Sequence, residues 1–98
     1  MSPVIGNKTN VAEASTKVKV KTTTTEVVKE NLQRNGLEIV NEGASNIFLN
    51  LGKAAVSEEG LFLAPSGSWD GRIGPMVWTG SVFGIAPGGE TSVTVAEV

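Results

Sequence analysis

Short runs of alternating apolar and polar residues, each soon ended by glycine, proline or asparagine, constrain this chain more than any other feature of its sequence. In residues 17–21, KVKVK, valines and lysines alternate, so the two kinds of side chain point to opposite faces of one strand. Residues 37–42 and 91–97 repeat the pattern, and residues 47–51, IFLNL, form the most apolar run. Because no segment shows a convincing helical period, we expect an all-β fold.

Turn signals divide the rest of the chain into further short strands at residues 22–28, 61–63, 68–73, 76–79 and 81–86. About eight such strands favour a small antiparallel β-sandwich or a jelly-roll-like unit. Residues 37–42 and 47–51 are predicted to pair as a hairpin around the turn at residues 43–46. The segment Pro87-Gly88-Gly89 is predicted to turn a second hairpin between residues 81–86 and 90–97.

The length of 98 residues suits one domain, and its first 15 residues show neither strand nor helix periodicity. We therefore predict an extended N-terminal arm at residues 1–15 and a single β domain at residues 16–98. The arm's apolar residues are candidate contacts to a neighbouring subunit: Pro3, Val4, Ile5 and Val11.

The two tryptophans are the other candidate binding residues. Trp69 stands between polar residues, and tryptophan is enriched at the centres of protein interfaces, so Trp69 is a candidate partner contact. A core position and stacking on a sugar ring are the alternatives for this side chain. Trp78 lies in the apolar segment MVWT, which favours core packing.

The composition removes most catalytic and metal sites. With no cysteine and no histidine there is no disulfide, no usual zinc ligand set and no Ser-His or Cys-His pair. The sequence also has no phosphate-binding glycine loop and no acidic spacing typical of a calcium loop. We expect a protein that is not an enzyme and that has no catalytic residue, metal or cofactor. Five carboxylates fall in predicted loops or at predicted strand ends, and we interpret them as surface charges: Glu58, Glu59, Asp70, Glu90 and Glu97.

Charge is unevenly distributed along the chain. Residues 1–34 hold six basic and three acidic side chains, whereas residues 35–98 hold two basic and seven acidic ones. The basic part is expected to face solvent or an acidic surface, its own or a neighbour's. No aromatic residues alternate with the lysines, and the net charge is −2, so no nucleic-acid partner is expected. No signal peptide or membrane span is evident, which predicts synthesis in a cytoplasm and no membrane partner.

Residues 34–97 resemble small virion proteins of tailed phages, of the head decoration or head-fibre type. The resemblance lies in the order Arg34, LEIVNEG at 37–43, IFL at 47–49, Gly52, Ala55, GLFLAP at 60–65, Ser68, WTGSV at 78–82, Ile85 and VTVAE at 93–97. It implies a β-sandwich or jelly-roll-like unit on the capsid surface of a virion, made in the host cytoplasm. It also implies the major capsid protein as partner and a homo-oligomer, with a trimer favoured.

The leading hypothesis is therefore a non-enzymatic capsid decoration, or cement, protein that binds the outer capsid surface and stabilises the head. A tail, baseplate or fibre component is the first alternative. A carbohydrate-binding adhesion module is the second, and it would require exposed aromatic side chains in a groove.

Overall fold

The computed structural model describes residues 14–98, which form ten β-strands, so the predicted all-β fold is confirmed. No helix in that range is long and apolar enough to cross a membrane. The arm residues Pro3, Val4, Ile5 and Val11 lie outside the described residues. The strands are β1 (Ala14–Val20), β2 (Thr25–Val28), β3 (Leu37–Asn41), β4 (Ile47–Leu51), β5 (Leu61–Leu63), β6 (Ser68–Trp69), β7 (Arg72–Ile73), β8 (Met76–Val77), β9 (Val82–Ile85) and β10 (Thr91–Glu97).

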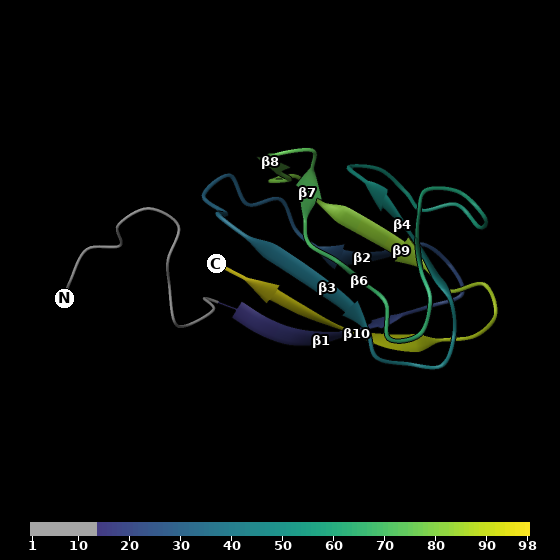
Figure 1. Ribbon diagram of the computed structural model, residues 1–98. Helices are drawn as coiled ribbons and strands as arrows, with labels where there is room; N and C mark the ends of the chain where they lie inside the picture. Colours follow the sequence, from purple (N-terminus) through teal and green to yellow (C-terminus); the bar gives the residue numbers. More distant parts are fainter. Residues whose placement is uncertain (1–13) are drawn as a thin grey trace.

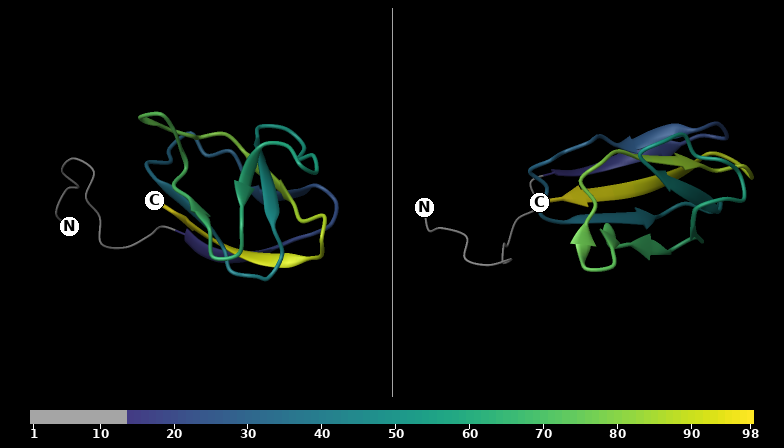
Figure 2. Two further views of the ribbon diagram at one scale, coloured as in Figure 1. Left: turned by 45° about the vertical axis from the view of Figure 1, so that its right-hand side comes forward. Right: turned by 90° about the horizontal axis from the view of Figure 1, so that it is seen from above.

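Eight of these strands form two packed antiparallel sheets, the architecture of a β-sandwich (Figure 1). The first sheet has the order β1-β10-β3-β6, and Figure 2 shows β1, β10 and β3 side by side. The second sheet has the order β2-β9-β4-β5, while β7 and β8 form a separate small hairpin. The first strand begins at Ala14, two residues before the predicted start of the β domain.

Both predicted hairpins are wrong, because the paired segments belong to different sheets. Strand β3 pairs with β10 and β6, whereas β4 pairs with β9 and β5. Likewise, the turn at Pro87 leads from β9 in the second sheet to β10 in the first. Alternation determines which side chains face inward, but in a sandwich both sheets face the same core, so the pattern does not say which strands are neighbours.

The segment predicted as one strand at residues 68–73 is divided into β6 and β7 at Gly71. Gly71 is buried and has a φ of +73°, a conformation that side chains with a Cβ atom rarely adopt. A Cβ atom at this position would lie 2.5 Å from the Cβ atom of Leu37. The chain therefore leaves the first sheet here and continues into the β7–β8 hairpin.

The core between the sheets is aliphatic. Its centre includes Ile39, Ile47 and Leu49, all fully buried, and burial of such a side chain contributes about 1.5–3 kcal/mol. Trp69 and Trp78 pack against this core and are partly buried. The buried core residues are Val20, Val27, Leu37, Ile39, Ile47, Leu49, Leu63, Val82, Ala86, Val93 and Val95. Since none of them is aromatic, all three phenylalanines of the chain lie outside this buried core.

A buried arginine closes one end of the sandwich. The side chain of Arg34 has no exposed surface, and its Nε lies 2.7 Å from Oε2 of Glu97. Its Nη1 and Nη2 atoms donate to the carbonyl oxygens of Trp78 and Lys29, at 2.6 and 2.7 Å. The interpretation of Glu97 as a surface charge is therefore wrong, because this carboxylate is only 15% exposed and pairs with Arg34.

Candidate functional site

The outer face of the first sheet is polar. In β1 the inward positions are Val18 and Val20, so Lys17 and Lys19 point outward, where they pair with Glu42 and Glu90. Each of the three ion pairs among residues 14–98, including Arg34–Glu97, joins a basic residue from the first 34 positions to an acidic residue beyond them. The sequence predicts that the basic segment faces solvent or an acidic surface. At Lys17, Lys19 and Arg34 the acidic partner belongs to residues 35–98 of the same chain.

The outer face of the second sheet is apolar. Because Ile47 and Leu49 fill the core, Phe48 between them points outward from β4. It is the register partner of Phe62 on β5 and of Ile85 on β9. The same alternation places Phe83 outward on β9, so all three phenylalanines lie on this face.

The loop at residues 52–60 covers part of this apolar face. Asn50, which alternates outward with Phe48, donates from Nδ2 to the carbonyl oxygen of Ala54 at 2.9 Å. The next residue, Ala55, is buried, and its backbone N–H donates to Oγ1 of Thr24 at 2.8 Å. Two adjacent residues of the loop, Ala54 and Ala55, are thereby held to β4 and to the connection before β2, and the uncovered remainder of the face lies around Phe48 and Phe62.

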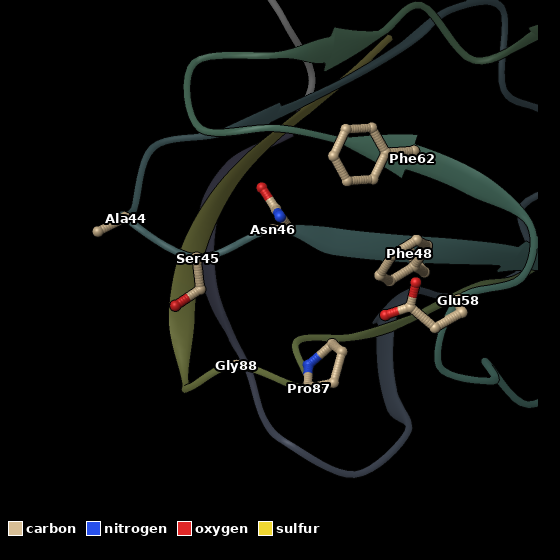
Figure 3. A pocket seen from close by; sticks show the side chains of 8 residues that line it. All are labelled: Ala44, Ser45, Asn46, Phe48, Glu58, Phe62, Pro87 and Gly88. Carbon is tan, nitrogen blue, oxygen red and sulfur yellow. The ribbon is translucent and has the colours of Figure 1, made fainter.

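A pocket of about 620 Å³ opens at this uncovered part (Figure 3). We call it the aromatic pocket. Phe48 and Phe62 line it from adjacent strands, with ring centroids 5.4 Å apart and ring planes tilted by 49°. Three connections far apart in sequence complete it with Ala44, Ser45, Asn46, Glu58, Pro87 and Gly88. Phe62 is 54% exposed, which is unusual for the largest apolar side chain of a strand.

A buried amide fixes one of these connections. Asn41, at the end of β3, donates from Nδ2 to the carbonyl oxygens of Ser45 and Leu63, at 2.8 and 3.0 Å. Its Oδ1 accepts from the backbone N–H of Gly43 and the hydroxyl of Thr91. Asn41 therefore links the two sheets and holds the turn that carries Ser45 and Asn46 against the pocket.

The sequence-predicted site residue Trp69 lies elsewhere, on β6 of the first sheet. It is half-buried against the core, and its indole Nε1 donates to the carbonyl oxygen of Arg72 at 3.3 Å. The indole Nε1 of Trp78 donates to the carbonyl oxygen of Ser81 at 2.9 Å. The structure does not bring Trp69 together with the aromatic pocket.

The candidate carboxylates are dispersed. Glu58 and Glu59 are exposed in one connection, Asp70 and Glu90 in two others, and of the four only Glu58 lines the aromatic pocket. Within residues 14–98 no three acidic side chains gather in a way that could hold a metal ion. Glu58 has a φ of +68°, so the turn that carries it holds a non-glycine residue in the left-handed region.

Sequence reasoning did not select Phe48 and Phe62 as site residues. A signal was present, because in the run IFLNL the phenylalanine is out of phase with Ile47 and Leu49, which fill the core. The pocket itself left no sequence signal, since its lining comes from residues 44–48, 58, 62 and 87–88.

No family model matches the chain, and no curated protein or solved structure is significantly similar to it. The fold and the site define a two-sheet β-sandwich with one polar face and one apolar face that carries an aromatic pocket. The features that bear on function are therefore this apolar surface and the sequence pattern of residues 34–97.

Proposed function

We propose that this chain is a non-enzymatic capsid decoration protein that docks on the major capsid protein of a tailed phage through its aromatic pocket. The observation that supports the aromatic pocket as the docking surface is the exposure of Phe62 beside Phe48. Both rings lie outside a core that is filled by other residues. Exposed aromatic residues at a concave site are typical of protein-binding surfaces. The sequence resemblance over residues 34–97 supplies the class of partner.

The pocket would form the centre of a larger contact. A stable interface buries about 800 Å² on each partner, more than one pocket provides. Phe83 and Ile85, which alternate outward on β9 and are partly exposed, extend the apolar surface beyond the pocket. Association of several copies, with a trimer favoured, would multiply a modest contact into stable attachment to the head.

The opposite sheet suits the solvent side of a particle. Its outer face carries ion-paired lysines, serine and threonine, which discourage further association. A module with one apolar and one polar face would thus bind the capsid with the second sheet and expose the first.

The adhesion alternative is less well supported. Phe48 and Phe62 meet its requirement for aromatic side chains in a groove, but neither indole ring contributes, because Trp69 and Trp78 pack against the core with their Nε1 atoms bonded to backbone carbonyls.

The experiment uses heads that are assembled from the major capsid protein of the same genome in the absence of this chain. We expect the chain to co-sediment with these heads until their binding sites are saturated. The heads with bound chain should withstand higher temperatures than heads without it, and isolated tails should not bind the chain. Binding to tails and not to heads would support a tail or fibre component instead. Binding to neither would overturn a virion role.

A further inference from the structure

We infer that the aromatic pocket receives a lysine or arginine side chain of the docking partner, an inference that rests on the proposed docking function. The feature that indicates a basic side chain is one carboxylate, Glu58, at a pocket whose walls include Phe48 and Phe62 (Figure 3).

The aromatic walls suit both parts of such a side chain. Lysine and arginine have apolar stems that cover hydrophobic surface while the charged group remains at its edge. Their cations are attracted to the face of an aromatic ring within about 6 Å of its centroid. Because the rings of Phe48 and Phe62 are tilted by 49° to one another, they present two differently oriented surfaces to one guest.

Charge complementarity points to the same guest. The carboxylate of Glu58 takes part in none of the three ion pairs that residues 14–98 form. No basic residue lines the pocket, whose other polar side chains are those of Ser45 and Asn46. An incoming cation would pair with Glu58, whereas an acidic guest would be repelled, and a purely apolar guest would remove water from the carboxylate without replacing it.

The size of the pocket indicates a side chain within a peptide segment rather than an isolated ion. A space of about 620 Å³ exceeds the volume of one lysine side chain and leaves room for adjacent residues of the partner. The alternative occupant is Lys8 of this chain's own N-terminal segment, and the experiment distinguishes it.

The test is an NMR titration of the full chain with two capped pentapeptides that differ only in a central lysine or norleucine. We expect the lysine peptide to bind in the millimolar range, to shift the resonances of Phe48, Phe62 and Glu58, and to bind at least fivefold more tightly than the norleucine peptide. The variant Glu58→Gln should abolish that preference, whereas the matched change Glu59→Gln, outside the pocket lining, should preserve it.

Equal binding of the two peptides, or an unchanged preference in Glu58→Gln, would overturn the inference. A chain lacking residues 2–13 that binds the lysine peptide more than fivefold more tightly would also overturn it, by showing that the chain's own segment fills the pocket. Because the titration contains no capsid, its failure leaves the proposed docking on capsids standing. Conversely, failure of capsid binding would not change the peptide result.

Discussion

The rings of Phe48 and Phe62 contact each other across β4 and β5 on the outside of the sandwich, with centroids 5.4 Å apart. A tilted pair of this kind contributes about 0.5–1.5 kcal/mol beyond its buried area, and partial exposure places this pair at the lower end. We expect a double-mutant cycle with alanine at both positions to give a coupling free energy of about 0.5–1 kcal/mol in urea unfolding. Strictly additive effects would show that the pair does not stabilise the fold.

Arg34 is expected to be the most sensitive polar residue of the fold. Arg34→Met would leave Glu97 buried without its cation and several carbonyl groups without a donor. Removal of one partner of a buried pair costs about 3–5 kcal/mol, a large share of the 5–15 kcal/mol that stabilises a typical domain. Urea unfolding measures this change.

Two variants keep the Arg34 prediction testable. Arg34→Lys retains the charge but not the planar donor set, so its unfolding free energy should fall between those of wild type and Arg34→Met. Arg72→Met, at an exposed arginine, should change it by less than about 1 kcal/mol. Equal stability of Arg34→Met and Arg72→Met would contradict the role of Arg34.

Asn41 should be the second sensitive polar residue. Asn41→Ala leaves the carbonyl groups of Ser45 and Leu63 without their donor, which costs about 2–3 kcal/mol at a buried site. The exposed Asn35 offers a matched control, and Asn35→Ala should stay within about 0.5 kcal/mol of wild type. Chemical denaturation of both variants checks this, and similar losses in the two would count against the cross-sheet role of Asn41.

The ion pair between Lys17 and Glu42 predicts a pH effect. The hydrogen bond from Lys17 is the main cause that lowers the pKa of Glu42 below its ordinary value of 4.5. A carboxyl whose pKa is lowered by folding stabilises the folded state above that ordinary value, and the contribution is lost as the pH falls through the folded pKa. Lys17→Met should therefore raise the pKa of Glu42 toward 4.5 in an NMR titration of the side-chain carboxyl.

The effect on stability should have the same pH dependence and remain small, because both side chains are exposed, Lys17 by 71% and Glu42 by 41%. Lys17→Met should be less stable than wild type near neutral pH and should match it once Glu42 is protonated. Lys21→Met serves as the control, since Lys21 forms no ion pair with the residues the structure describes. An unchanged pKa of Glu42 in Lys17→Met would refute the assignment.

Alternation predicted much of the fold, because it reports directly which side chains are buried. In residues 37–41 and 47–51 it correctly identified strands whose inward residues include Ile39 and Leu49. It also contained the position of Glu97, which is in phase with the inward Val93 and Val95. The interpretation of Glu97 as a strand-end charge overlooked that phase.

Alternation predicts neither which strands pair nor where the pocket lies. Sheet membership depends on where the connections after Asn41 and Ala86 cross the sandwich, and both sheets share one core. The pocket depends on three connections that carry Asn46, Glu58 and Pro87 to one place, a tertiary relationship without a local period.

Binding of two matched variants to capsids that lack this chain tests the docking claim most directly. Phe62→Ser removes the exposed ring of the aromatic pocket. Leu32→Ser removes a 71% exposed apolar side chain in the connection before β3, whereas the pocket is lined by the turn after β3. Truncation of a central interface residue costs about 2 kcal/mol or more, so Phe62→Ser should weaken binding at least tenfold. Leu32→Ser should bind as wild type does, and both variants should stay folded by circular dichroism. Wild-type affinity of folded Phe62→Ser would contradict docking through the aromatic pocket.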